Sequence, residues 1–221
     1  MPQDYLVTFE FNFDLIWRLI DEIGPRGTCR LLEPVAAQAK KAAKLHAKTG
    51  REHGFALCMR READPKRLKK GDVKASPIVA GEEHDIRIPD MKCEPPYEKI
   101  GVVHTHSESP EPSPPDIINA PIGCVVNAKT GETWCYSAET RECAKYAKAF
   151  RELYSIRLSL LEWLLALDRD VRAGKISKEE YAKKKVQIWK ELDKWEQETI
   201  RKTDEFLDQC GCHVTVKLGT E

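Results

Sequence analysis

The sequence predicts a mixed α/β domain followed by an antiparallel helical hairpin. Over the first 138 residues, short apolar segments typical of strands alternate with segments of helical periodicity. In the last third, apolar residues recur every three or four positions over two long stretches. The composition, 41% hydrophobic and 33% charged, excludes a disordered or collagen-like chain. We assign residues 1–138 to the α/β domain, with the first 30 as an extension, and residues 139–221 to the hairpin and a cysteine-containing tail.

The N-terminal part predicts one strand and two helices. Tyr5–Phe11 alternates apolar and polar residues, which is the period of a strand. Asp14–Ile23 has the pattern of a short helix closed by a Gly-Pro pair. Leu32–Lys48 is rich in alanine and predicts a strong helix, with Pro34 near its first turn and Gly50 just past its end.

The middle of the chain predicts short strands joined by loops. We expect strands at Gly54–Met59, Ser76–Val79, Asp85–Ile88 and Lys99–His106, and a hairpin of Ile122–Asn127 with Glu132–Tyr136. Four prolines make residues 107–115 a loop.

The last third predicts two helices packed on each other. Gly174 ends the first helix, and Ser177 with Glu180 forms a capping box for the second. Trp163, Trp189 and Trp195 fall in the helical patterns, so we expect them in the core or in the packing of the hairpin. We expect residues 139–209 to select the partner or substrate and to take no part in chemistry, with a homodimer through the hairpin as one option.

The residues with the clearest chemical pattern are His104, His106 and Asp116. Residues i and i+2 of a strand share one face, so both imidazoles can reach one metal ion. Ser113 reads as the N-cap of a short helix, with Asp116 three residues on, and the proline loop turns that helix back toward the strand end. Two histidines and one carboxylate form a catalytic zinc set, because three protein ligands leave the fourth position for water.

A hydrolytic zinc site also needs a group that takes a proton from water. Glu52 is the candidate, because it opens the Gly54–Met59 strand after the alanine-rich helix. A buried carboxylate beside the metal can accept that proton and pass it to the leaving amine. Taken singly, each of these residues also has an ordinary explanation: a solvated Glu, strand-end histidines and a simple capping box.

Glu52, His104-Thr105-His106 and Ser113-Pro114-Pro115-Asp116 together resemble the motif of the JAMM (MPN) family of zinc metalloproteases, over roughly residues 30 to 137. The resemblance implies a cytidine-deaminase-like α/β sandwich with Zn²⁺ on His104, His106 and Asp116. It further implies Glu52 as the general base and Ser113 as a donor to the developing oxyanion. The substrate would be a protein or peptide, including ubiquitin-like conjugates.

The chain departs from that motif at three places. Ser107 stands where the family has proline, the gap from His106 to Ser113 is one residue shorter, and Gly54 is one position closer to Glu52. Some family members are scaffolds that bind no metal. The alternative function is therefore a non-catalytic MPN-like module that binds partner proteins through its helical hairpin.

Other residues carry weaker signals. Cys210 and Cys212 could bind metal or form a redox pair, but the sequence has no second cysteine pair at zinc-finger spacing, so we expect a terminal turn with free or disulfide-bonded thiols. The remaining six cysteines are isolated in the sequence, and those on strands read as small core residues. His46 and His84 read as surface residues. Lys40–Lys74 has 12 basic and 4 acidic residues, but no interleaved aromatics, so nucleic-acid binding ranks last.

The predicted location is cytoplasmic, without membrane insertion. The most apolar run is too short to span a bilayer, and the N-terminus has no basic region typical of a signal peptide. Asparagine and glutamine are scarce, a bias seen in hyperthermophile proteins. Disulfides persist inside such cells, so eight cysteines would be compatible with that location.

Overall fold

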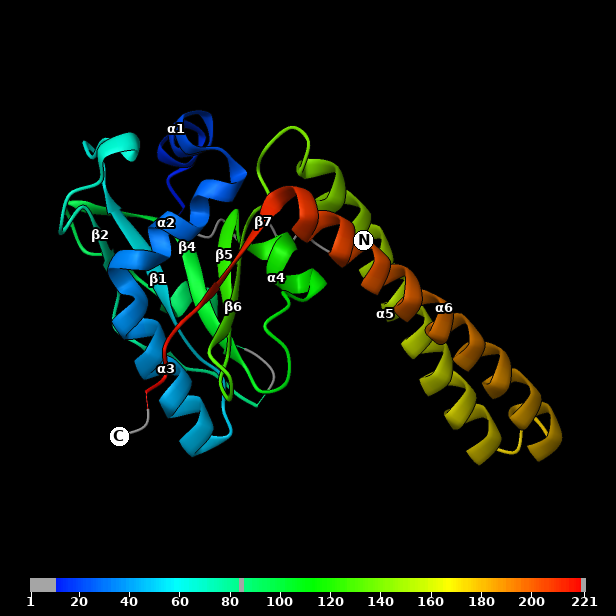
Figure 1. The fold of residues 1–221 in the computed structure, drawn as a ribbon. Coiled ribbons are helices and arrows are strands. Elements are labelled where there is room, and N and C mark those ends of the chain that lie inside the picture. The colour runs from blue at the N-terminus through cyan, green and yellow to red at the C-terminus, as the bar shows by residue number, and fades with distance from the viewer. Residues whose placement is uncertain (1–10, 84–85, 220–221) are drawn as a thin grey trace.

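A mixed β-sheet forms the middle layer of the fold in the computed structural model, which describes residues 11–83 and 86–219 (Figure 1). In the described residues the strand order is β2-β1-β4-β5-β6-β7, and β3 pairs with β1. The pair β4–β5 is parallel and the other pairs are antiparallel. The strands are β1 (His53–Arg60), β2 (Val73–Ala75), β3 (Val79–Ala80), β4 (Tyr97–His106), β5 (Ile122–Asn127), β6 (Glu132–Ser137) and β7 (Gly211–Thr215).

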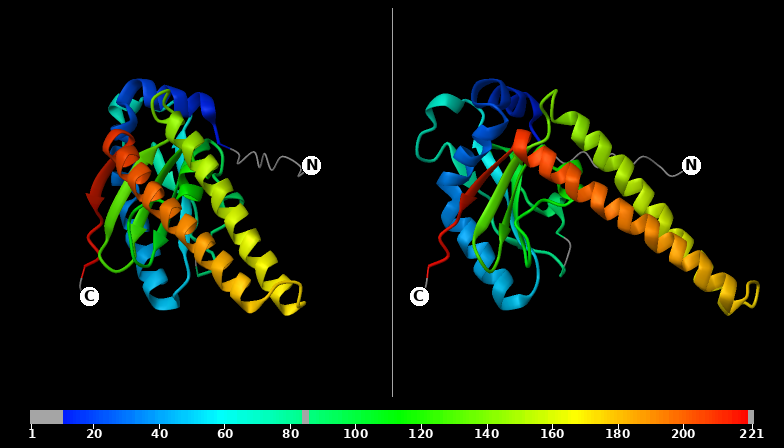
Figure 2. Two further views of the ribbon diagram at one scale, coloured as in Figure 1. Left: turned by 90° about the vertical axis from the view of Figure 1, so that its right-hand side faces the viewer. Right: turned by 45° about the vertical axis from the view of Figure 1, so that its right-hand side comes forward.

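Helices cover both faces of this sheet, as Figure 2 shows. The helices are α1 (Phe13–Ile23), α2 (Thr28–Leu32), α3 (Ala36–Thr49), α4 (Pro114–Asn119), α5 (Ala144–Arg172) and α6 (Lys178–Cys210). Successive residues of β6 mark the two faces. Cys135 packs in the core with α1, α2 and α3, whereas Tyr136 packs with α4, α5 and α6.

Small side chains let α3 lie close to the sheet. Ala39, Ala42 and Ala43 are fully buried and pack in one cluster with Phe55 and Leu57 of β1. Gly50 ends the helix in the left-handed conformation, with φ 68°. The chain then turns directly into β1, and this turn places Glu52 at the beginning of that strand.

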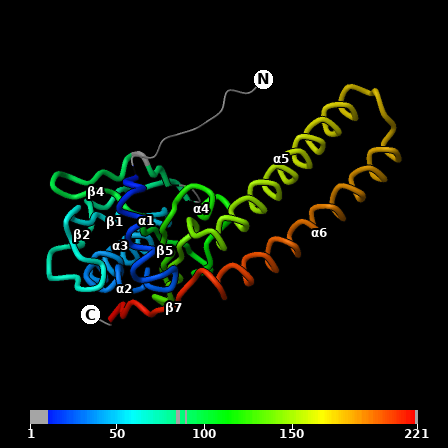
Figure 3. Tube along the Cα trace, turned by 90° about the horizontal axis from the view of Figure 1, so that it is seen from above, coloured from blue at the N-terminus to red at the C-terminus, as the bar shows by residue number. Residues whose placement is uncertain are grey.

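The α5–α6 hairpin projects from the body of the molecule (Figure 3). The side-chain oxygen of Ser177 accepts from the backbone N–H of Glu180, as the capping box predicts. The helices pack on each other along their length, but Trp163 and Trp189 are 64% and 51% exposed. The expectation that Trp163 and Trp189 pack in the core or inside the hairpin is therefore wrong, whereas Trp195 is half-buried and donates its indole N–H to the carbonyl of Leu153.

The segment after α6 returns to the sheet. Gly211–Thr215 forms β7 and pairs antiparallel with β6, so the expected terminal turn around Cys210 and Cys212 is wrong. The pairing is a contact between segments far apart in the chain, and a five-residue segment has no periodicity long enough to predict it. At the other end, α1 is part of the main core through Leu15, Ile16 and Leu19.

All eight cysteines are paired, so the interpretation of six of them as isolated is wrong, whereas those on strands, Cys58, Cys124 and Cys135, are buried in the core as expected. The pairs are Cys29–Cys212, Cys58–Cys93, Cys124–Cys135 and Cys143–Cys210. Two of the bonds tie the C-terminal segment down: Cys143–Cys210 joins the ends of the helical hairpin, and Cys29–Cys212 joins α2 to β7. These partners are distant in sequence, and eight cysteines allow 105 pairings, so spacing alone could not assign them.

Most other elements follow the expected positions, with a few differences. The strand expected at Tyr5–Phe11 lies outside the described residues except for Phe11, which forms a single bridge with Lys99. Of Asp85–Ile88, the described residues form no strand, and a 3₁₀ turn begins at Ile88. Of the strand expected at Ser76–Val79, only Val79 is in a strand, as the first residue of β3, and β2 ends just before Ser76.

Within the described residues, no helix combines the length and the apolar character that a bilayer span requires.

Candidate metal centre

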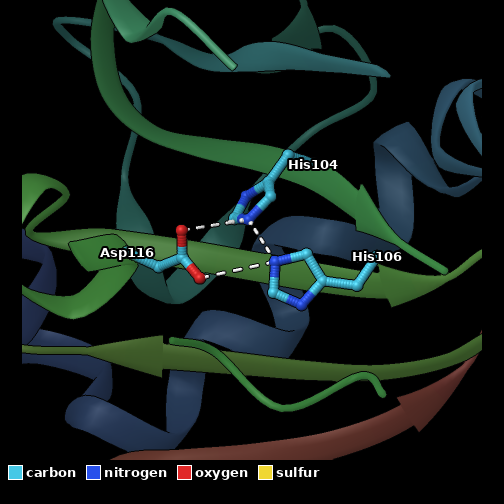
Figure 4. Close-up of side chains that lie close together, drawn as sticks. All are labelled: His104, His106 and Asp116. Atoms are coloured by element: carbon cyan, nitrogen blue, oxygen red, sulfur yellow. Dashed lines mark hydrogen bonds and ion pairs between the residues drawn. The ribbon is translucent and has the colours of Figure 1, made fainter. Parts of the chain in front are cut away.

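His104 and His106 lie on one face at the end of β4, next to α4 (Figure 4). Their Nε2 atoms are 3.1 Å apart. The carboxylate of Asp116 completes the group: Oδ1 lies 3.2 Å from Nε2 of His104, and Oδ2 lies 3.5 Å from Nε2 of His106. The structure therefore brings together the three residues that the sequence predicted as ligands.

A capping box holds Asp116 in place at the start of α4. Its Oδ2 accepts hydrogen bonds from the backbone N–H of Ser113, at 2.7 Å, and from the Ser113 hydroxyl, at 2.6 Å. The hydroxyl of Tyr136 donates to the backbone carbonyl of Asp116 at 2.8 Å. Ser113 directs its hydroxyl proton to the carboxylate, so in this structure it orients Asp116.

The spacing of these three side chains fits a metal ion. Ligands of a tetrahedral ion with bonds of about 2.0–2.1 Å lie about 3.3 Å apart. The three separations of 3.1, 3.2 and 3.5 Å surround that value. Two neutral imidazole nitrogens and a carboxylate are also the donor types that zinc accepts. The group can therefore hold a metal ion, and the same donor set also suits ferrous iron.

Burial and neighbouring charges shift the pKa values of all three side chains in opposing directions. Burial alone would raise the pKa of Asp116, but His104, together with His106 and Ser113, holds the pKa of that carboxyl well below its usual range. Burial would lower the pKa of His104, and the Asp116 carboxylate more than offsets it, so that pKa is raised. Burial and the neighbouring His104 lower the pKa of His106 to about 4. Asp116 is thus an anion, the form that a metal ligand needs.

Glu52 lies at the edge of the same group. Its side chain is buried, and Oε1 is 3.9 Å from Nε2 of His106. The close approach of β1 to β4 accounts for this position, because Gly54 pairs with His104 and a Cβ atom at Gly54 would stand 2.6 Å from the carbonyl oxygen of Val103. Only glycine at position 54, two residues after Glu52, lets the backbones of β1 and β4 approach this closely.

Behind the ligands, the opposite face of β4 is fixed to α3. The Thr105 hydroxyl oxygen lies 2.7 Å from Nδ1 of His46 and accepts from the backbone N–H of His53 at 3.0 Å. His46 is 3% exposed, so its interpretation as a surface residue is wrong. A lone histidine near a helix end gives no signal of burial, whereas here it anchors the residue between the two ligands. His84 lies outside the described residues.

The centre opens into a cavity of about 400 Å³ between the sheet and α5. Glu52, His104, His106, Ser113 and Asp116 line it together with apolar residues of the 86–91 segment and of β4. Tyr154 and Arg157 of α5 also line this cavity. The hairpin therefore forms part of the cavity wall. The expectation that residues 139–209 take no part in the chemistry did not include this contact. A sequence pattern cannot reveal such a contact, because the two residues lie more than thirty positions after Asp116.

We expect the double variant His104→Ala, His106→Ala to lose the metal. Each histidine supplies one of three ligands, and a carboxylate alone does not hold a divalent transition ion tightly. Elemental analysis of purified protein, loaded with zinc and then dialysed, measures the stoichiometry. His213→Ala, at an exposed histidine on β7, is the matched control and should keep one ion per chain. Full zinc content in the double variant would show that the ion binds elsewhere.

Ser113→Ala should weaken metal binding about 10–100-fold, because groups that orient a ligand have effects of this size. The variant removes a hydrogen bond to Asp116 without touching a ligand. Ser113→Thr keeps the hydroxyl and serves as the control. Competition with a chromophoric chelator measures both affinities, and equal affinity of the alanine variant and the native protein would contradict the orienting role.

Comparisons with known proteins give this chain no relative: no family model, no curated protein and no solved structure matches it.

Proposed function

We propose that the chain is a zinc-dependent metallopeptidase or isopeptidase of the JAMM (MPN) type. The observation that supports this most directly is the joint presence of three ligands and Glu52 in one cavity. Structural zinc sites have four protein ligands, whereas three candidate ligands are grouped here and the Glu52 carboxylate lies beside them. The sheet covered by helices on both faces is compatible with the α/β sandwich of that family.

In this proposal each residue has a separate task. A zinc ion bound by the three ligands would lower the pKa of a water molecule and polarise the scissile carbonyl. Glu52 takes the proton of the attacking water and transfers it to the leaving amine. Ser113 orients Asp116, and its expected role as oxyanion donor requires the hydroxyl to turn away from that carboxylate. Burial of the centre strengthens these charge interactions, because little water screens them.

The test is a zinc and activity measurement on the purified chain. Elemental analysis decides between zinc and iron. Hydrolysis of quenched-fluorescent peptides and of a ubiquitin-like conjugate, with zinc and after chelation, decides whether amide bonds are cleaved. The proposal requires one zinc per chain and zinc-dependent cleavage of at least one substrate. A chain that is loaded with zinc and cleaves none of these would refute it.

The second candidate, a scaffold that binds a partner protein or a second copy of the chain, is favoured by exposed apolar residues on the hairpin. Besides Trp163 and Trp189, these are Ile156, Leu158, Leu165, Val186 and Ile200. A scaffold would not need an intact ligand set. Light scattering reports whether the chain is a dimer, and absence of bound metal would favour this candidate over the peptidase.

Four disulfides restrict where such a protein can work. They persist in oxidising compartments and in the cytosol of hyperthermophiles. The scarcity of asparagine and glutamine supports the second, so we keep a cytoplasmic location as part of the proposal.

A further inference from the structure

We propose that Arg157 binds a carboxylate of the substrate beside the scissile amide, so that the site selects acidic peptides. The inference rests on the proposed hydrolase function. The carboxylate can belong to an aspartate or glutamate side chain or to a C-terminus, since both present the same two oxygens to a guanidinium.

Arg157 reaches the metal cavity from the helical hairpin. It is half-buried on α5 and lines the cavity together with His104 and Asp116. The cavity lining holds two acidic residues, Glu52 and Asp116, and both lie close to the histidines. Among the described residues of the lining, Arg157 is the one side chain that carries a positive charge at any physiological pH. Arg157 therefore places a positive charge on the side of the cavity formed by α5.

A tryptophan on the neighbouring helix supports this arginine. The guanidinium carbon lies 5.4 Å from the centroid of the Trp195 ring, a cation–π contact. Trp195 is fixed in turn by its indole N–H, which donates to the carbonyl of Leu153 on α5. Contact with the ring restricts the long side chain before any ligand arrives, so less conformational entropy is lost on binding.

The N–H groups of Arg157 are available to a ligand. Across residues 11–83 and 86–219, no carboxylate lies within ion-pair distance of Arg157, whereas Arg201 on α6 has two, Glu198 and Glu205. Tyr154, one turn earlier on the same face of α5, lines the cavity as well and adds a hydroxyl donor. A planar guanidinium can bind a carboxylate with two parallel hydrogen bonds, which gives direction as well as affinity.

Three quenched-fluorescent peptides of one length test the inference. One has glutamate beside the scissile bond and an amidated C-terminus, the second has glutamine and a short C-terminal side that ends in a free carboxylate, and the third has glutamine and an amide. The first two distinguish the two sources of the carboxylate. The zinc-loaded protein is compared with Arg157→Gln, and with Arg151→Gln, which removes the same charge from an exposed position on α5.

Arg157→Gln should reduce the kcat/KM ratio of the preferred acidic peptide over the neutral peptide about tenfold or more, as expected for one bidentate charge-assisted contact. The kcat/KM ratio of Arg157→Lys should lie between those of the native protein and Arg157→Gln, because lysine keeps the charge but lacks the planar guanidinium. Arg151→Gln should keep the native preference. An unchanged ratio in Arg157→Gln overturns the inference, and so does an equal loss for all three peptides.

A binding measurement separates this inference from the proposed chemistry. Fluorescence anisotropy on zinc-loaded Glu52→Gln reports affinity for the same peptides without turnover. Arg157-dependent preference for an acidic peptide, with no cleavage by the native protein, would support the carboxylate site and refute the peptidase. Cleavage of all three peptides with no effect of Arg157 on affinity would support the peptidase and refute the carboxylate site.

Discussion

Glu52→Gln is expected to keep the zinc, and its hydrolysis rate is expected to fall about 10²–10⁴-fold, which is the usual contribution of a general base. Glutamine has nearly the same shape as glutamate, but its amide cannot accept a proton at neutral pH. The side chain lies 3.9 Å from His106 and is not among the three grouped ligands, so the metal should stay. Initial rates on a peptide substrate and elemental analysis of the same sample measure both effects.

Glu82→Gln is the matched control for this variant. Glu82 accepts the backbone N–H of Glu52 through its carbonyl, but its own carboxylate points to Arg51 and is exposed. Its rate should equal that of the native protein. Loss of zinc from Glu52→Gln would instead show that Glu52 is a metal ligand. A native hydrolysis rate with zinc still bound would show that Glu52 takes no part in the reaction.

Removing the Cys29–Cys212 disulfide should cost about 4.5 kcal/mol of unfolding free energy, whereas removing Cys124–Cys135 should cost about 3 kcal/mol. The difference comes from the unfolded chain: with the other disulfides intact, the first bond closes a ring of about 70 chain positions, whereas the second closes a loop across 11. A longer loop gains more conformational freedom when it is opened. Cys29→Ala with Cys212→Ala also removes the covalent bond between α2 and β7 at the edge of the sheet, so its loss should exceed that of the other pair.

Urea unfolding of both double-alanine variants, with the other disulfides intact, measures this difference. Cys124→Ala with Cys135→Ala is the internal control, since it removes the same number of sulfur atoms from paired strands of the sheet. Equal losses in the two variants would mean that loop length does not determine the stabilisation. A larger loss for Cys124–Cys135 would assign the effect to packing in the core, where both sulfurs are fully buried.

Local spacing predicted the parts of the molecule that depend on near neighbours. The i, i+2 alternation of a strand places His104 and His106 on one face, and the N-cap pattern at Ser113 fixes Asp116. The same reasoning gives the α5–α6 hairpin, because its helices follow long periodic stretches and its turn holds Gly174 and the N-cap residue Ser177.

Contacts between distant segments could not be obtained in this way. The pairing of β7 with β6, the partner of Cys29 and the position of Arg157 beside the centre all depend on how the hairpin packs against the sheet. No sequence periodicity relates such residues, and the contacts between them stabilise the protein only once the distant segments have come together. His46 shows the same limit, because one polar side chain on an alanine-rich helix has no pattern that marks it as buried.

The pairing of the cysteines imposes an order on biosynthesis. Cys58–Cys93 and Cys124–Cys135 join neighbours in the chain, so each can form soon after the ribosome has released both partners. Cys29 and Cys143 must wait for Cys212 and Cys210, which are translated almost two hundred and almost seventy codons later. Oxidative maturation of this chain is therefore completed only after residues 210–212 have been synthesised, and any earlier bond of Cys29 or Cys143 to another cysteine must be reversed by thiol–disulfide exchange.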